Sequence, residues 1–340
     1  MADRSGRNWK LLIGDCRDRL ADLPEGSVQT CITSPPYWGL RDYGVDGQMG
    51  LEETPDDFLS AMVEVFRSVW RVLRDDGTLW VNMGDSYANT NGLSGTPADI
   101  DHGGTSFRGG RYEKQPCVGI PLGLKQKDLC GMPWRLAFAL QSDGWYLRSD
   151  IIWSKPNPMP ESVTDRPTKA HEYIFLLTKR PRYFYDADAI REKYDGSTKP
   201  RSRASNFKKA GSQDDRFGSH NHGAEIIIAN PNGRNRRTVW EIPTQPYSEA
   251  HFATFPEALV VPCVLAGSRE GDTVLDPFAG SGTTGKVAVE LGREFIGVEL
   301  NPEYADLAAK RITNPKKWSM PGAVSHKPID GQTMLFGEDD

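Results

Sequence analysis

Residues 273–285 read TVLDPFAGSGTTG, and this stretch decides the fold. Its apolar start predicts a buried strand that ends at Asp276, and the residues after it predict a helix that begins near Thr283. Gly280 and Gly282 lie in the turn between them, where glycine permits a positive φ and a close approach of the backbone to a ligand. A strand, a glycine turn and a helix N-terminus in this order are typical of a nucleotide-like ligand site in an α/β fold.

The rest of the chain repeats this alternation of strands and helices. Further strands are predicted at WKLLIGD, VQTCI, GTLWVNMGD, LRSDIIWSK, EYIFLLTK and EFIGVEL. Helices are predicted at about Pro55–Leu73, Pro133–Ser142, Pro256–Ala266 and over PEYADLAAKRI. Strands that alternate with helices predict an α/β fold with a mainly parallel sheet covered on both faces.

Charge and composition divide the chain into four parts. Residues 179–237 hold fourteen Lys and Arg against seven Asp and Glu, a local balance of +7, so the remainder carries −12 of the total of −5. A basic insert on an acidic body is typical of a protein that contacts phosphate with one face, although charge alone equally fits a solvated loop. We therefore expect two halves of one domain at 1–178 and 238–314, a basic insert at 179–237, and a polar tail at 315–340.

Composition excludes several classes of protein. The chain has 340 residues, 38% hydrophobic and 26% charged, which is typical of a globular protein. Its five cysteines are scattered and form no C-x-x-C pair, so we expect no disulfide framework and no metal site. No apolar run is long enough to span a membrane, and the N-terminus lacks a signal-peptide core. We expect a soluble, cytoplasmic protein.

The residues around the glycine turn indicate which ligand it holds. Glu299 ends the next predicted strand, twenty-three residues after Asp276, where a carboxylate can accept bonds from ribose hydroxyls. The turn is neither G-x-G-x-x-G nor a phosphate-binding loop with GK[ST]. Asp276 beside it would repel a pyrophosphate and attract an ammonium. This favours S-adenosylmethionine over NAD.

Two further segments can complete this pocket, although each alone also fits plain structure. LLIGDC ends a predicted strand at Asp15, whose carboxylate can accept the amino group of adenine. HFATFPEAL opens a predicted helix with Phe255, Pro256 and Glu257, which can pack on the methionine half of the cofactor.

The segment TSPPY at Thr33–Tyr37 follows the apolar run VQTCI. Two prolines fix φ twice and remove two N–H donors, so the turn is stiff and can aim acceptors on Ser34 and Pro35 outward. The amino nitrogen of adenine or cytosine is a poor nucleophile, and two acceptors on its hydrogens favour a pyramidal nitrogen that can attack a sulfonium methyl. Tyr37 offers a face for stacking. Ser34, Pro35, Pro36 and Tyr37 are therefore the candidate catalytic residues, and a base in duplex DNA has to flip out to reach them.

Three features follow one another along the chain: SPPY, a basic variable region and DPFAGSGTT. With this order, the chain resembles over Trp9–Ile312 the β class of amino-DNA methyltransferases, which methylate adenine N6 or cytosine N4. The resemblance implies a Rossmann-like methyltransferase fold with a seven-stranded sheet and a circularly permuted motif order. It implies S-adenosylmethionine as cofactor, double-stranded DNA as partner, and a role for the basic insert at 179–237 as the target-recognition region. YWGLRDYG after the catalytic motif resembles phage-type members, and GDSYA and SDIIWSKPNPMPES resemble family segments near the active site.

The resemblance also implies roles for single residues. The adenosine part contacts Asp15 and Phe278, the ribose contacts Glu299, and the methionine half contacts Phe255, Asp276 and the turn. The full set of expected cofactor-binding residues is Asp15, Cys16, Phe255, Asp276, Pro277, Phe278, Gly280, Ser281, Gly282, Thr283 and Glu299. Expected DNA contacts, helped by the loop Gly103–Lys114, are Arg201, Arg203, Lys208, Lys209, Arg234, Arg236 and Arg237.

The sequence decides almost evenly between adenine N6 and cytosine N4 as the target. Ser34 in place of aspartate leans toward cytosine N4, the phage-like extension leans toward adenine N6, and we slightly favour adenine. No Pro-Cys pair lies beside a fitting Glu-Asn-Val motif, so cytosine C5 chemistry is disfavoured. The resemblance is compatible with a homodimer, and the protein is either a solitary methyltransferase or the partner of a separate restriction endonuclease. The rival interpretations are an RNA or small-molecule methyltransferase, a non-catalytic DNA-binding protein with this fold, and a nicotinamide dehydrogenase.

Overall fold

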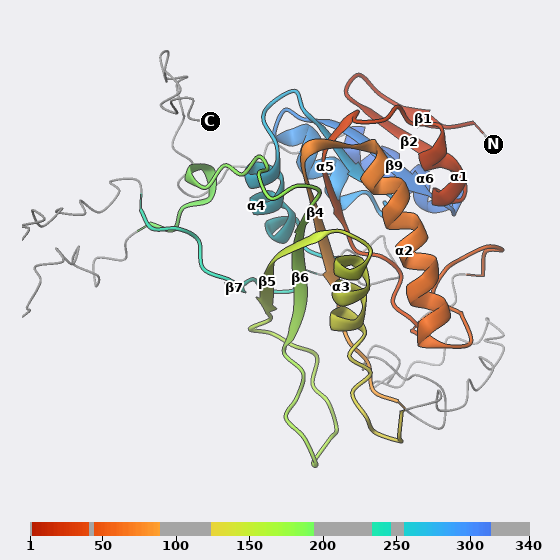
Figure 1. Ribbon diagram of the computed structural model, residues 1–340, viewed down its shortest axis with the longest axis vertical. Coiled ribbons are helices and arrows are strands. Elements are labelled where there is room, and N and C mark those ends of the chain that lie inside the picture. Colours follow the sequence, from red (N-terminus) through yellow and green to blue (C-terminus); the bar gives the residue numbers. More distant parts are fainter. Residues whose placement is uncertain (1, 41–43, 89–123, 194–232, 246–254, 314–340) are drawn as a thin grey trace, which may run out of the picture.

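The computed structural model describes residues 2–40, 44–88, 124–193, 233–245 and 255–313, which Figure 1 draws in colour. Its strands are β1 (Arg4–Ser5), β2 (Trp9–Ile13), β3 (Val28–Thr33), β4 (Leu73–Met83), β5 (Tyr146–Ser154), β6 (His171–Thr178), β7 (Val239–Glu241), β8 (Thr273–Asp276) and β9 (Glu294–Glu299). Its helices are α1 (Cys16–Ala21), α2 (Pro55–Val72), α3 (Met132–Ser142), the 3₁₀ helix η2 (Asp188–Ile190), α4 (Glu257–Gly267), α5 (Thr283–Glu290) and α6 (Pro302–Thr313).

Within the described residues the strands form one sheet in the order β1-β2-β9-β8-β3-β4-β6-β5-β7. Neighbours from β2 to β4 are parallel, β6 is antiparallel to both β4 and β5, and β7 is parallel to β5. The α/β prediction is confirmed, but the sheet has nine strands rather than seven. The two additional strands are the edges β1 and β7, which have two and three residues and are too short to show a period-2 pattern.

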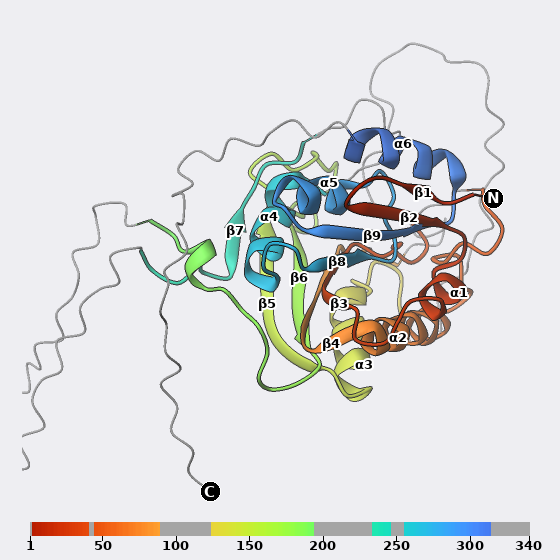
Figure 2. The same cartoon turned by 90° about the horizontal axis from the view of Figure 1, so that it is seen from above.

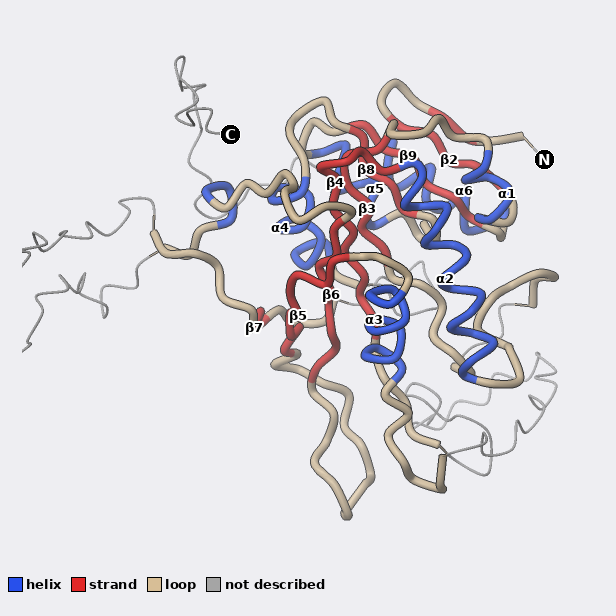
Figure 3. Tube along the Cα trace, viewed as in Figure 1, coloured by secondary structure: helices blue, strands red, loops and turns tan. Residues whose placement is uncertain are grey.

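Helices cover both faces of the sheet, as Figures 2 and 3 show. One hydrophobic cluster packs α1, α2 and α3 on one face, and a second packs α4, α5 and α6 on the other. In β4, Leu79 and Val81 belong to the first cluster and Trp80 to the second, because successive side chains of a strand point to opposite faces. The apolar runs that predicted the strands are apolar because both faces are buried.

Local signals account for the helix boundaries. The α2 helix begins after Thr54, whose hydroxyl accepts from the Asp57 N–H at 3.1 Å, and Pro55 occupies the first turn, where no donor is lost. The α5 helix begins after Gly282, which has a φ of 77°. No helix of the described residues is long and apolar enough to cross a membrane.

The topology gathers the predicted motifs at one edge. Parallel strands β2, β9, β8, β3 and β4 all end there, and ligands of open α/β sheets bind outside such carboxyl ends. The late strand β8 lies between β9 and the early strand β3, so the permuted motif order is a feature of the fold.

The predicted insert begins against the body of the protein. Described residues after β6 return to it: the Phe184 N–H donates to the Asp76 carbonyl and the Asp186 N–H donates to the Ala266 carbonyl, both at 2.9 Å. The division at residues 178, 237 and 314 stays a prediction, and the predicted tail at 315–340 lies outside the described residues.

Candidate cofactor and base site

The catalytic motif and the glycine turn meet because their strands are neighbours. β3 pairs with β8 in parallel, with Thr30 opposite Val274 and Cys31 opposite Leu275. At the ends of these strands the Thr33 hydroxyl donates to Asp276 Oδ1 at 2.6 Å, although the two residues are 243 positions apart. The SPPY turn therefore starts one residue after a direct contact with the cofactor motif.

Asp276 is buried at the end of β8, below the SPPY turn and the glycine turn. Its side chain is 1% exposed, and besides the Thr33 hydroxyl it accepts the backbone N–H of Phe278 at 3.1 Å. Burial raises the pKa of this carboxyl to about 6, and hydrogen bonds from Thr33, Thr284 and Phe278 oppose part of that rise. The carboxylate thus joins the start of the glycine turn to the strand that carries the catalytic motif.

The glycine turn depends on its glycines for a steric reason. Gly280 and Gly282 have φ values of 50° and 77°, in the left-handed region that side chains disfavour. A Cβ on Gly282 would lie 2.8 Å from the Cβ of Ala308, so the turn and α6 could not pack as they do. Ser281 and Thr283 are buried, and both hydroxyls accept from the Arg311 guanidinium, at 3.0 and 2.9 Å.

Glu299 ends β9 beside this turn. Its Oε2 accepts the Gly280 N–H and its Oε1 accepts the Asn301 N–H, both at 2.8 Å. Burial raises the pKa of Glu299 to about 6, against these hydrogen bonds. Each carboxylate oxygen has a second lone pair, so the fixed carboxylate can also accept bonds from ribose hydroxyls.

The end of β2 lies next to Glu299, since the Gly14 N–H donates to the Glu299 carbonyl at 3.0 Å. Asp15 caps α1 by accepting the Arg17 N–H at 2.9 Å and also pairs with the Arg17 guanidinium. That hydrogen-bonded pair lowers the pKa of Asp15. Cys16 is buried in the core, and burial raises the pKa of its thiol to about 12. The structure thus places Asp15 at the predicted edge and the Cys16 thiol in the core.

Phe255 approaches the same edge from the N-terminal side of α4. With Thr33 and Asn82 it lines a small hollow, whose other walls are Ile32, Trp80, Ile174, Leu259, Val260 and Cys263. Pro277 is buried, and the half-buried Phe278 packs on the α1–α3 cluster. Of the predicted segment HFATFPEAL, residues 251–254 lie outside the described part of the chain.

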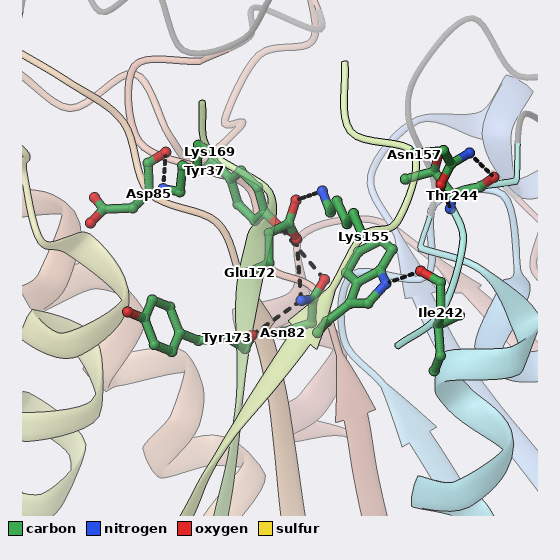
Figure 4. Close-up of polar contacts among 11 residues, drawn as sticks. Tyr37, Asn82, Asp85, Lys155, Asn157, Lys169, Glu172, Tyr173, Ile242 and Thr244 are labelled. Atoms are coloured by element: carbon green, nitrogen blue, oxygen red, sulfur yellow. Dashed lines mark hydrogen bonds and ion pairs between the residues drawn. The ribbon is translucent and has the colours of Figure 1, made fainter. Parts of the chain in front are cut away.

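In the catalytic turn, Pro35 is buried and Ser34, Pro36 and Tyr37 are half-buried. The Tyr37 hydroxyl donates to Glu172 Oε2 at 2.9 Å (Figure 4). Burial, followed by the Glu172 charge, raises the pKa of Tyr37 well above its usual value, so the phenol stays protonated at neutral pH.

The motif analysis missed two residues beside Tyr37, Asn82 and Glu172, whereas a third, Lys155, lies in the segment SDIIWSKPNPMPES that was expected near the active site. Asn82 Nδ2 donates to Glu172 Oε2 at 3.3 Å, and the Lys155 ammonium pairs with Glu172 Oε1 (Figure 4). They lie at or next to the ends of β4, β5 and β6. A polar residue at a strand end is a usable signal, but these positions meet only because β6 runs antiparallel and begins at the site edge.

The expected DNA contacts are only partly described. Arg234 and Arg237 both pair with Glu192 at 2.9 Å, and the Arg236 guanidinium lies 4.6 Å from the centre of the Trp240 ring. Arg237 keeps 67% of its side chain exposed. The loop at 103–114 and the expected contacts Arg201, Arg203, Lys208 and Lys209 lie outside the described residues.

A glycine turn, an acid at the end of the adjacent strand and an S-P-P-Y turn at one sheet edge define an α/β enzyme of the methyltransferase type. Residues 28–310 match the sequence profile of the N6/N4 methyltransferase family, described as DNA methylase. The chain belongs to this family.

Relatives and solved structures agree with this assignment. The chain is 48% identical to the type II methyltransferase M.Cfr9I of Citrobacter freundii (89% of this chain, 87% of the relative) and 49% identical to M.SmaI of Serratia marcescens (90% and 91%). A putative DNA modification methylase of Thermus thermophilus, solved with S-adenosyl-L-methionine, superposes with a TM-score of 0.53 at 26% identity (89% and 92%). The cytosine-N4-specific PvuII DNA methyltransferase shares the fold, with a TM-score of 0.59 at 20% identity (90% and 87%). The phage-type affinity stays a prediction.

Proposed function

We propose that the protein transfers a methyl group from S-adenosylmethionine to an exocyclic amino group of a base in double-stranded DNA. The observation that carries the proposal is the junction of the two motifs, where Thr33 of the catalytic strand donates to Asp276 of the cofactor strand at 2.6 Å. A donor methyl and an acceptor amine have to meet within a few ångströms, and this junction brings their expected binding turns to one edge of the sheet.

The residues at this edge fit the cofactor. Glu299 is half-buried and held by two backbone N–H groups, which suits a fixed acceptor for ribose hydroxyls. Asp15 and Phe278 flank the adenosine side, and Phe255, Asp276 and the turn from Gly280 to Thr283 hold the methionine half. When bound, the cofactor supplies an electrophilic methyl group on a sulfonium. The solved relative from Thermus thermophilus, whose title names S-adenosyl-L-methionine, supports this choice.

The chain's own part in the chemistry is positioning. Ser34 and the carbonyl of Pro35 accept the two hydrogens of the amino group, which directs the nitrogen lone pair toward the methyl group. Pro36 keeps the turn stiff, and the Tyr37 ring stacks on the base. The target base has to leave the helix, at a cost of a few kcal/mol.

The test incubates the purified chain with unmodified duplex DNA and cofactor labelled in its methyl group. The DNA is then digested to nucleosides, which are separated by mass. N6-methyladenine is the product that we slightly favour, and N4-methylcytosine would correct the base while keeping the reaction class. Finding only 5-methylcytosine, or no methylated base, would overturn the proposal. Plasmid DNA and RNA in competition decide between the two nucleic acids.

The expected partners are separate proposals. Expected DNA contacts such as Arg237 serve recognition of the duplex, and its exposed guanidinium is available for phosphate. A homodimer is checked by light scattering with and without DNA. A cognate restriction endonuclease is tested by protection: DNA methylated by this protein should resist such an enzyme at the shared sequence.

A further inference from the structure

A half-buried ion pair lies next to the catalytic tyrosine. Lys155 and Glu172 pair through the Glu172 Oε1 oxygen, with side-chain exposures of only 18% and 16%. The Lys155 ammonium also lies 4.3 Å from the centre of the Trp153 ring. The other Glu172 oxygen, Oε2, accepts the Tyr37 hydroxyl at 2.9 Å (Figure 4). One carboxylate therefore connects a charged group just after β5 with the catalytic turn.

Such a pair is weak evidence for a contribution to the stability of the fold. Removing two charges from water costs several kcal/mol per ion, and apolar side chains of similar volume often serve stability equally well. Glu172 instead uses both oxygens to bind three donors: the Tyr37 hydroxyl, Asn82 Nδ2 at 3.3 Å, and Lys155. Asn82 is itself oriented, because Nδ2 also donates to the Tyr173 carbonyl at 3.1 Å. Asn82 on β4 and Lys155 just after β5 therefore hold the Glu172 carboxylate in the position where it contacts Tyr37.

Close packing restricts the Tyr37 ring further. A Cβ on Gly84 would lie 2.9 Å from Tyr37 Cε2 and 3.3 Å from the Glu172 carboxyl carbon, so this glycine leaves room for both groups. The ring is thus confined along its edge by Gly84 and at its hydroxyl by Glu172. A ring that stacks on a flipped base needs one fixed orientation, since a displacement of about 1 Å can lower a rate about 100-fold.

We propose that Glu172 is a positioning residue for methyl transfer, which acts through the Tyr37 hydroxyl to hold the ring where the target base stacks, and that Lys155 and Asn82 hold Glu172. The inference rests on the proposed function, because it concerns the base-binding part of the same site. Glu172 touches neither the cofactor motif nor the Ser34–Pro35 acceptors in this account, so its loss should change kcat and leave cofactor binding intact.

A double-mutant cycle tests this role in the full-length protein. Glu172→Ala and Tyr37→Phe should each lower kcat, by at most about 100-fold. The double variant should fall no further than Tyr37→Phe alone, because the Tyr37–Glu172 contact is absent from both, although Tyr37→Phe also removes the weaker contact of the hydroxyl with Asn82 Oδ1 at 3.5 Å. The KM for S-adenosylmethionine and its calorimetric affinity should stay at the wild-type values in all three. If Glu172→Ala fails to fold, the same cycle is run with Glu172→Gln.

A second double variant separates the geometric role of Glu172 from the effect of its charge. Glu172→Gln combined with Lys155→Met removes both charges but keeps a side-chain oxygen that can accept the Tyr37 hydroxyl, so kcat should return toward the wild-type value. A matched control is Asp143→Ala, which removes another partly buried carboxylate, paired with Arg67 at the end of α3, and should leave kcat unchanged.

The outcomes are distinct. Two results would overturn the positioning role: additive losses of kcat in the cycle, or a loss of cofactor affinity in Glu172→Ala equal to its loss of kcat. In either case, methyl transfer by the wild-type protein would still uphold the proposed function. A wild-type protein that methylates no DNA overturns the proposed function, and the inference that rests on it falls with it.

Discussion

Asp276→Asn is expected to stabilise the protein at neutral pH. The Asp276 side chain is 1% exposed, and burial raises its pKa from 3.8 to about 6. Between these values the folded state binds more protons than the unfolded state. The contribution of this group to stability is therefore fully present below pH 4 and is lost as the pH rises through 6. Asparagine has no charge to bury and escapes this loss.

The magnitude follows from the two pKa values. A difference of about two units corresponds to about 3 kcal/mol at 1.36 kcal/mol per unit, reached above pH 7. Asparagine keeps the acceptor: Oδ1 alone receives both the Thr33 hydroxyl and the Phe278 N–H in the present structure. Its Nδ2 can donate to the nearby Thr284 hydroxyl, which itself donates to the Ile32 carbonyl at 3.3 Å. Rearranging these bonds costs about 1 kcal/mol, which leaves a net gain of about 2 kcal/mol at neutral pH.

The assay is urea unfolding followed by tryptophan fluorescence at pH 4, 6 and 7.5. The stability of the variant relative to the wild type should increase over this range by about 2–3 kcal/mol. Glu299 titrates in the same window, and the Asp276 charge contributes to the rise of its pKa. The Asn substitution removes that contribution, which adds to the relative stability of the variant at neutral pH. Asp276→Ala is the control: it leaves the Phe278 N–H without its acceptor, should be less stable by about 1–3 kcal/mol, and should lose cofactor binding while the fold is kept. A constant difference between the Asn variant and the wild type across this pH range would refute the reasoning.

Three further substitutions separate the parts of the site. Tyr37→Ala should retain calorimetric binding of S-adenosylmethionine and lose turnover, because it removes the stacking face together with the hydroxyl that Glu172 holds and leaves the cofactor motif in place; unchanged turnover would show that the base does not stack there. Glu299→Ala should weaken cofactor binding by about 1.5–3 kcal/mol, the value of hydrogen bonds to a charged acceptor, with Glu290→Ala at the far end of α5 as control. Lys208→Ala with Lys209→Ala should lower the slope of log K against log salt by about 2 if both bind phosphate, and an unchanged slope would remove them from the interface.

Local chemistry explains why most of the fold was predictable. Residues 273–285 indicate a strand, a turn and a helix because an apolar run, two glycines and a helical pattern occupy adjacent positions. The observed β8, Gly280–Gly282 turn and α5 follow this pattern. Two prolines likewise mark the stiff turn after β3. Such signals depend on residues close together in sequence, so one chain without relatives reveals them.

The strands and the site residue that were missed carry no distinctive signal in the residues next to them. β1 and β7 pair through backbone groups over two and three residues, and their side chains need no periodic pattern. Glu172 opens the run EYIFLLTK and looks like an ordinary polar strand end. Its significance depends on β6 running against β4, which brings it to Asn82 and Tyr37.

The sequence by itself determined the classes of element, the positions of the two motifs and the kind of ligand that they suit, because conformational preference, periodicity and charge reside in neighbouring residues. Only the tertiary structure decided that Thr33 contacts Asp276, that the half-buried Glu172 carboxylate supports Tyr37, and that the sheet extends to nine strands in the described chain. Those outcomes depend on strand order and direction, which arise when distant segments bury their apolar faces together and which no short stretch of residues encodes alone.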